Sequence, residues 1–369
     1  MSNLFAIDKE AGGAIEIYAN ELCDRMSPSP EIVDYSEVSG DRQALCHYAV
    51  WYLYRDRVVE QRDEKTLVTI HHLQRWNETM EEIANRKISL VTMSSEWFRF
   101  LQTRVNKDRV SIVPHGVNPE EWPLRKRVVA SKKFNIGIVG RCYPDGRKGE
   151  RLVPHIVNQL PEGKFRISIV GVGWEKIINK LQACNVDVEY QESVSFDELK
   201  AFCADFDVFL CTSDLEGGPL PLLETMSLGI TPVSSPVGLS RDLLAGTGLG
   251  YLFPKGNAAA CARILSKLIS GKYPMISPER LRAAATHLSW ENAARGYEAL
   301  YSAIEKGIPL PSDPTNYFEW LAQLRGNRRL RFDEKVALAS NPAPTDRWTQ
   351  PRVWRAWNKF ARLFLGTWA

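Results

Sequence analysis

Short runs of β-branched and aliphatic residues alternate with segments of helical length through the middle of the chain. The runs span residues 135–139, 165–170, 186–190, 207–210 and 230–233. The segments between them span residues 149–159, 174–184, 196–202 and 220–228. Strands that alternate with helices predict a parallel sheet with right-handed crossovers. Ligands of such sheets bind at the carboxyl ends of the strands, so candidate chemistry is expected in the loops that follow them.

The first part of the chain shows the same pattern more weakly, with apolar runs at residues 4–7, 66–70, 90–94 and 110–113. We therefore expect a second α/β domain over residues 1–117, which is short for a complete doubly wound domain. The middle domain is expected to span residues 118–305. Ser289 is a candidate N-cap for its closing helix, which is expected to run to about Lys306. A helical extension over residues 306–369 completes the predicted organisation.

The composition is that of an ordinary globular protein, with 44% hydrophobic and 25% charged residues among 369. A net charge of +3 at pH 7 excludes the whole-protein basic field that is typical of nucleic-acid binders. The seven cysteines are scattered, which argues against a disulfide framework or a zinc site and favours buried thiols in a reducing compartment. The first ten residues contain Asp8 and Glu10 and lack a basic start, so we expect no signal peptide and a cytoplasmic protein.

The strongest chemical signal is the segment from Glu216 to Glu224, which follows a predicted strand and opens a predicted helix. Gly217 and Gly218 allow a ligand to approach the backbone closely, and the free N–H groups at the helix start, near Leu220, attract phosphate. The first glutamate is placed to reach a sugar, and the second is placed to accept two hydrogen bonds from a diol such as ribose. The alternative is a plain helix start whose acidic residues complement the helix dipole.

A basic loop from Gly140 to Gly149 follows the first strand of the middle domain. It places Arg141 and Lys148 at the carboxyl end of that strand, where a diphosphate would bind. Two cations there would stabilise the charge that develops on a departing nucleoside diphosphate. The alternative is a solvated basic loop without a ligand.

Taken together, these motifs resemble those of the family 4 glycosyltransferases, which have the GT-B fold of two Rossmann-like domains facing across a cleft. The resemblance covers about residues 1–305 and is strongest over 110–305. Its elements, in chain order, are Gly12-Gly13, His71, residues 113–118, the loop 140–149, residues 170–173, the segment 216–224 and Ser289-Trp290-Glu291. Pro219 departs from the pattern, because many relatives have glycine there and proline cannot donate a hydrogen bond.

The resemblance implies a retaining transfer of a sugar from a nucleotide-diphosphate sugar. Arg141 and Lys148 would hold the diphosphate, Glu224 the ribose hydroxyls, and Glu216 the donor sugar. The backbone of Gly217, Gly218 and Leu220 would cradle phosphate. From the opposite domain, His71 would contact the donor sugar and Gly13 would lie near the diphosphate or the acceptor. No cofactor and no metal are expected, because arginine and lysine supply the positive charge.

Several other signals receive less weight. Asp205-Phe206-Asp207 imitates a metal-binding pair of aspartates, but it lies at the entry of a buried strand rather than at a carboxyl end. His71 and His72 are neighbours that point to opposite faces of a strand, so they do not form a metal site, and one of them is expected to be structural. His115 is interpreted as a turn residue near the cleft.

The last residues of the chain, 347–369, contain five basic residues and no acidic one. In a helix, Arg355, Lys359 and Arg362 share one face while tryptophan, phenylalanine and leucine cover the rest. Such a helix is typical of the interface of an anionic membrane, which would place the protein at the inner face of the plasma membrane and suggest a lipid-linked acceptor. The alternative is a final helix that packs on the first domain.

Two other functions remain open on the sequence alone. One is a nucleotide-sugar epimerase or a phosphorylase on the same fold, although the extra acid and base groups of the first and the pyridoxal lysine of the second are not evident. The other is a non-enzymatic scaffold derived from a transferase. The nucleotide base, the donor sugar, the acceptor, the linkage and the oligomeric state are not encoded in any motif found here.

Overall fold

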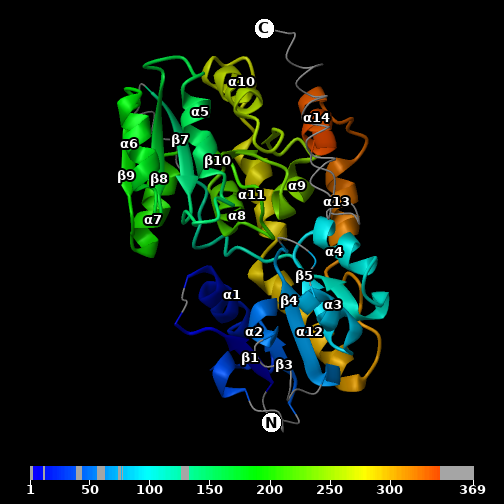
Figure 1. Ribbon diagram of the computed structural model, residues 1–369. Helices are drawn as coiled ribbons and strands as arrows, with labels where there is room; N and C mark the ends of the chain where they lie inside the picture. Colours follow the sequence, from blue (N-terminus) through cyan, green and yellow to red (C-terminus); the bar gives the residue numbers. More distant parts are fainter. Residues whose placement is uncertain are drawn as a thin grey trace.

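The computed structural model describes residues 3–10, 13–38, 44–55, 63–73, 76, 78–125 and 133–340. Two six-stranded sheets form its two domains, one built from the first third of the chain and one from the middle. Every strand pairing within either sheet is parallel. Figure 1 shows the two domains one above the other, with the start of the chain in the lower one. The predicted α/β fold with two Rossmann-like domains is confirmed.

The first sheet has the strand order β2-β1-β3-β4-β5-β6. Its strands are β1 (Leu4–Ile7), β2 (Glu31–Asp34), β3 (Cys46–Tyr48), β4 (Thr66–Ile70), β5 (Ser89–Thr92) and β6 (Val110–Ile112). Its helices are α1 (Ala14–Cys23), α2 (Trp51–Arg55), α3 (Glu78–Asn85) and α4 (Ser95–Gln102). The central strands β1 and β4 are fully buried, as expected for a parallel sheet covered on both faces.

Strands β2 and β3 lie outside the apolar runs of the sequence, because they are only four and three residues long and are partly polar. His47 in β3 is completely buried. Its Nε2 lies 2.7 Å from Thr69 Oγ1 and its Nδ1 lies 3.0 Å from Tyr301 Oη. Both ring nitrogens therefore have partners, which allows a histidine to occupy the core of the sheet.

The second sheet has the order β12-β11-β10-β7-β8-β9. Its strands are β7 (Phe134–Val139), β8 (Phe165–Val170), β9 (Val188–Gln191), β10 (Val208–Cys211), β11 (Thr231–Ser234) and β12 (Tyr251–Leu252). Its helices are α5 (Val153–Val157), α6 (Glu175–Ala183), α7 (Phe196–Ala204), α8 (Leu220–Ser227), α9 (Gly238–Leu244), α10 (Ala258–Ile269) and α11 (Pro278–His287). The strand order reverses between β7 and β10, and such a reversal opens a crevice at the carboxyl ends of those two strands.

The helix α12 (Trp290–Lys306) leaves the second domain and packs against α1 of the first. Ser289 caps it, as expected, by accepting a hydrogen bond from Asn292 N. The hydroxyl of Tyr297 in α12 is hydrogen-bonded to that of Tyr18 in α1, and its ring stacks on His47 at 5.2 Å. The closing helix of the predicted 118–305 range therefore contributes its buried face to the first domain.

Two further helices follow, α13 (Tyr317–Arg325), which lies beside α4 where the two domains meet, and α14 (Phe332–Ser340), which lies beside the second domain. Phe318 in α13 packs on Phe98 in α4 at 5.3 Å, and α14 packs on β12. The predicted amphipathic helix in residues 347–369 lies outside the described residues. Within the described part of the chain, no helix is both long and apolar enough to cross a bilayer.

Candidate functional site

The two predicted donor-binding segments meet at the reversal between β7 and β10. The basic loop follows β7, and the acidic segment follows β10. Thr212 Oγ1 donates to the carbonyl of Lys148 at 2.8 Å, and the N–H of Asp214 donates to the carbonyl of Arg147 at 2.8 Å. These bonds hold the backbones of the two loops side by side, although 64 residues separate Lys148 from Thr212.

Lys148 and Glu216 form an ion pair across these loops, with 2.6 Å between Nζ and Oε1. Ser213 donates a second hydrogen bond to the same carboxylate oxygen at 2.8 Å. Burial opposes both charges, but the attraction between them outweighs it. The pKa of Lys148 is therefore raised and the pKa of Glu216 is lowered, so both groups are charged at neutral pH.

Arg141 lies at the mouth of the same crevice and is exposed to solvent. The loop that carries it is anchored just before it, because the indole N–H of Trp174 donates to the carbonyl of Gly140 at 2.7 Å. Just after it, the N–H of Cys142 donates to the carbonyl of Val172 at 2.9 Å. The backbone on both sides of Arg141 is thus fixed, while its guanidinium faces water.

Glu224 lies on α8, the helix that Leu220 opens after Pro219. Among the described residues its carboxyl group forms no hydrogen bond or ion pair, and burial raises its pKa to about 8. Withdrawing part of a carboxyl group from water without a protein partner is costly, which is consistent with a ligand as its partner. Its assignment to ribose stays a prediction.

At Gly217 and Gly218, other atoms already fill the space into which a side chain would project. A Cβ atom on Gly217 would lie 2.2 Å from the carbonyl oxygen of His71, and one on Gly218 would lie 2.5 Å from the His115 ring. Close contact between the two domains therefore requires these glycines, independently of any phosphate. The indole N–H of Trp97, in α4, reaches the same loop at the carbonyl of Glu216, 3.3 Å away.

His71 follows β4 and reaches this contact from the first domain. Its Nε2 lies 2.8 Å from the carbonyl of Ala49, so that nitrogen carries the proton and Nδ1 remains an acceptor. Burial lowers its pKa to about 4, which keeps the ring neutral at physiological pH. Gly13 precedes α1 with a φ of 72°, and nothing lies within 4 Å of where its Cβ would be. Gly13 therefore faces open space at the surface of the first domain.

Two further histidines, His72 and His115, interact with residues of this site. His72 is subject to the charges of Glu216, Arg147 and Lys148, although burial is what chiefly lowers its pKa to about 4. His115, which was expected in a turn near the cleft, is 2% exposed and packs between Gly218 and Trp290, so it is a buried contact between the two domains. The signal for His72 was a histidine pair directly after a strand, and the signal for His115 was its place in the motif at residues 113–118.

The pair of aspartates at 205 and 207 lies at the amino end of β10, away from the crevice. The carboxylate of Asp207 accepts the N–H of Asn135 at 2.8 Å, and that of Asp205 accepts from Asn135 Nδ2 at 3.1 Å and pairs with Arg166. These contacts join β7, β8 and β10. Over the described residues, no group of three histidine, cysteine or acidic side chains is arranged to hold a metal ion.

Residues 133–271, which contain the whole second sheet with the loop 140–149 and the segment 216–224, match the family Glycosyl transferases group 1. The matched residues make up most of the second domain. The resemblance to family 4 glycosyltransferases that the motifs indicated is thereby confirmed.

Two curated relatives are named as biosynthesis glycosyltransferases. The amylovoran biosynthesis glycosyltransferase AmsK of Erwinia amylovora is 26% identical over 211 residues, covering 54% of this chain and 51% of the relative. The putative colanic acid biosynthesis glycosyltransferase WcaL of Escherichia coli is 28% identical over 200 residues, covering 50% and 48%. The chain thus spans about half the length of these relatives.

A solved structure resembles the chain over both domains. HepE of Anabaena, determined in complex with UDP-glucose, superposes with a TM-score of 0.67 over 84% of this chain and 100% of its own, at 12% identity. At that identity the likeness concerns the fold, and it agrees with the predicted GT-B arrangement.

Proposed function

We propose that the chain is a glycosyltransferase that moves a sugar from a nucleotide-diphosphate sugar to a saccharide or lipid-linked acceptor. The observation that carries the proposal is the partly buried Lys148–Glu216 ion pair at the sheet reversal, directly beside the contact of Gly217 with His71. A cation and a carboxylate are held there at the junction of two domains, where a nucleotide sugar binds in proteins of this fold.

Lys148 and Arg141 would bind the donor diphosphate. The ammonium of Lys148 has three N–H donors, so it can retain Glu216 while it donates to phosphate oxygens. Arg141 is exposed at the crevice and adds a planar guanidinium, which suits phosphate. Together they would offset the charge that appears on the diphosphate as the glycosidic bond breaks, which makes a metal ion unnecessary.

Glu216 would orient the donor sugar, with His71 opposite it. The carboxylate of Glu216 is held by Lys148 and Ser213, so it can accept hydrogen bonds from sugar hydroxyls in a fixed direction. The Nδ1 atom of neutral His71 can accept another. In the proposed retaining step, the bond from the anomeric carbon to the phosphate oxygen breaks while the acceptor oxygen attacks from the same face. The acceptor proton passes to the departing phosphate oxygen.

Glu224 would bind the ribose hydroxyls as a carboxylate. Since its pKa is about 8 in the free protein, the group is largely protonated at neutral pH. Two hydroxyl donors favour the ionised form, so nucleotide binding is expected to release a proton near pH 7. Titration calorimetry in buffers of different ionisation enthalpy measures that proton directly. The signal should vanish in Glu224→Gln.

The acceptor class is proposed from the named roles of the relatives, which concern amylovoran and colanic acid biosynthesis. Both names refer to polysaccharide assembly. A saccharide acceptor, free or carried on a lipid, is consistent with a cleft between two domains. The basic, tryptophan-rich end of the chain would bring the protein to an anionic membrane where such acceptors are assembled.

The decisive experiment is thermal stabilisation of the full chain by UDP-, GDP-, dTDP-, ADP- and CMP-linked compounds, with and without EDTA. A ligand of the folded state raises the midpoint by mass action. We expect one nucleotide family to raise it, EDTA to have no effect, and Arg141→Ala and Lys148→Ala to abolish the shift. Arg263→Ala, an exposed arginine on α10, is the matched control and should respond like the wild type.

Absence of stabilisation by every nucleotide would overturn the proposal and favour a scaffold. If a donor binds, the anomeric configuration of the transferred sugar, measured by NMR, separates retention from inversion. An inverted product would leave the donor site in place but remove the same-face mechanism.

A further inference from the structure

The backbone carbonyl of Glu216 accepts a hydrogen bond from the opposite domain. The indole N–H of Trp97, in α4 of the first domain, donates to it over 3.3 Å. The next carbonyl of the loop, that of Gly217, instead accepts the N–H of Leu239 from α9 of its own domain, at 2.9 Å. Of two neighbouring peptide groups in this loop, one is therefore oriented by a side chain that belongs to the first domain.

The orientation of this peptide group bears directly on the side chain of Glu216. The carbonyl belongs to the peptide that joins Glu216 to Gly217, so its direction sets ψ of the glutamate and limits φ of the glycine. Glycine has no side chain that restricts its backbone, so contacts from outside the loop are needed to hold one conformation. The carboxylate is bound by Lys148 and Ser213. The backbone and the carboxylate of Glu216 are thus fixed by separate partners.

The Trp97 side chain has a defined position of its own. It is 2% exposed, and its ring packs edge-on against Phe100 with 5.9 Å between the ring centres. An indole N–H can only donate, and when it is buried it usually finds an acceptor. Here the acceptor is the carbonyl of Glu216, so a displacement of α4 would remove a donor on which the Glu216 backbone depends.

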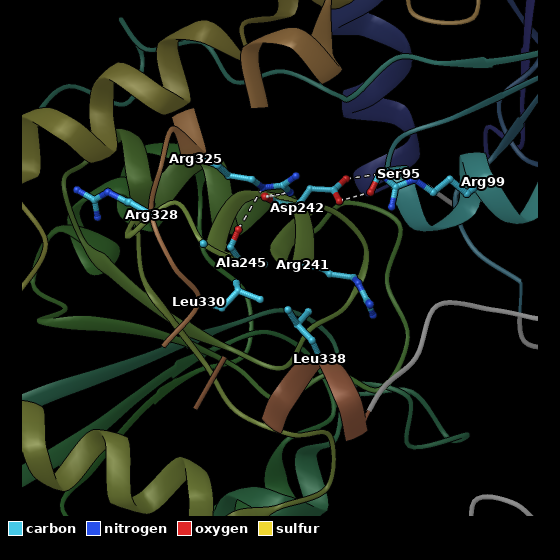
Figure 2. A pocket seen from close by; sticks show the side chains of 10 residues that line it. Ser95, Arg99, Arg241, Asp242, Ala245, Arg325, Arg328, Leu330 and Leu338 are labelled. Carbon is cyan, nitrogen blue, oxygen red and sulfur yellow. Dashed lines mark hydrogen bonds between the residues drawn. The ribbon is translucent and has the colours of Figure 1, made fainter. Parts of the chain in front are cut away.

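The start of α4 is fastened to the second domain beside Trp97. The backbone N–H of Ser95 donates to the carboxylate of Asp242 in α9 over 2.7 Å, and its hydroxyl donates to the same carboxylate, as Figure 2 shows. Ser95 and Asp242 also line a cavity of about 310 Å³, together with Arg325 of α13. The helix that carries Trp97 is therefore held in place relative to the loop that carries Glu216.

We propose that Trp97 is a positioning residue for Glu216, whose carboxylate it directs toward the transferred sugar by holding the adjacent peptide group. The inference rests on the proposed function, because that carboxylate has a sugar to bind only if the ligand is a nucleotide sugar. The diphosphate is assigned to Arg141 and Lys148. Loss of the Trp97 N–H is therefore expected to weaken recognition of the sugar and not of the diphosphate.

Titration calorimetry of the full chain with nucleoside diphosphates and their sugar-linked forms tests this assignment. The probes are four pairs: UDP and UDP-glucose, GDP and GDP-mannose, dTDP and dTDP-glucose, and ADP and ADP-glucose. For the pair that binds the wild type, Trp97→Phe should weaken the nucleotide sugar about threefold to tenfold and leave the diphosphate within about twofold, since the change removes one hydrogen bond. Trp320→Phe, on α13, where the ring stacks on His287, is the matched control and should alter neither affinity.

The comparison of two ligands separates positioning from a purely structural role. A general loss of stability in Trp97→Phe lowers the thermal midpoint but does not change the ratio of the two affinities. A double-mutant cycle with Glu216→Gln tests whether Trp97 acts through that carboxylate. The ratio should be the same in Glu216→Gln and in the double variant, because the group that Trp97 positions is then already altered.

Three outcomes would overturn the inference while the donor site stands. These are an unchanged ratio in Trp97→Phe, an equal loss of affinity for both ligands, or effects of Trp97→Phe and Glu216→Gln on the ratio that simply add. If the wild type binds none of the eight compounds, the proposed function itself fails, and the role of Trp97 fails with it.

Discussion

The carboxyl group of Glu224 is partly exposed, forms no hydrogen bond or ion pair within the described chain and has a pKa of about 8. The pKa of an unfolded glutamate is near 4.3. When the pKa is higher in the folded state, the group's contribution to the stability of the fold is fully present below the unfolded pKa. This contribution is lost as the pH rises through the folded pKa. We predict that the thermal midpoint falls between about pH 5 and pH 9 in the wild type, and by a smaller amount in Glu224→Gln.

The control for this prediction is Glu162→Gln, a change at an exposed glutamate. It should leave the pH dependence of the wild type intact. If the thermal midpoints of the wild type and Glu224→Gln change with pH by the same amount, the elevated pKa of Glu224 is contradicted. The expected proton release on nucleotide binding is then contradicted as well.

The variant Gly217→Ala tests how closely the two domains must approach each other. A methyl group there would lie 2.2 Å from the carbonyl oxygen of His71, which belongs to the backbone and cannot swing aside as a flexible side chain could. We predict that Gly217→Ala lowers the free energy of unfolding by about 1–3 kcal/mol, measured by urea denaturation. Gly163→Ala is the comparison, because its Cβ would face open space and its cost comes only from a φ of 69°, about 1–2 kcal/mol.

These two variants differ in a second way. Gly217→Ala should also weaken nucleotide binding, since it displaces the loop that carries Glu216, whereas Gly163→Ala should not. Equal nucleotide affinity in both variants would mean that the contact between Gly217 and His71 does not position the donor site.

At the scale of elements, α4 and α9 connect the domains through Ser95 and Asp242. Loss of the Ser95 hydroxyl would remove a donor from a buried carboxylate. We predict that Ser95→Ala lowers the free energy of unfolding by about 1–3 kcal/mol. Urea denaturation measures it, with Ser270→Ala, at an exposed helix end, as a control expected to change little. If Ser95→Ala leaves the free energy of unfolding unchanged, the two helices are held together mainly by apolar packing.

At the scale of the whole molecule, the proposed binding to a membrane depends on residues 347–369. Their basic and aromatic pattern predicts binding to anionic membranes. Deletion of these residues should abolish flotation with vesicles that contain phosphatidylglycerol and leave the thermal midpoint unchanged. A lowered midpoint together with unchanged flotation would support the alternative, a helix packed on the first domain.

Much of the fold and of the candidate site could be predicted from the sequence alone, because the signals for them are local. A strand, the loop after it and the next helix are consecutive in the chain, so the alternation of apolar runs predicted the two parallel sheets, and the loops 140–149 and 216–224 could be placed at strand ends. Ser289 was identifiable as a helix cap for the same reason. Three strands were missed: β12 has only two residues, and β2 and β3 are short and partly polar, so none of them forms an apolar run.

Only the tertiary structure decided how these local pieces meet. Lys148 and Glu216 are 68 residues apart, and they pair because the strand order reverses between β7 and β10. The requirement for Gly217 and Gly218 comes from His71 and His115, which lie in distant segments. The cavity lined by Ser95, Asp242 and Arg325 combines α4, α9 and α13, which no single stretch of sequence contains. Local pattern reflects the backbone preferences of neighbouring residues, whereas ion pairs and close approaches depend on distances that arise only when the two sheets and α12 pack together.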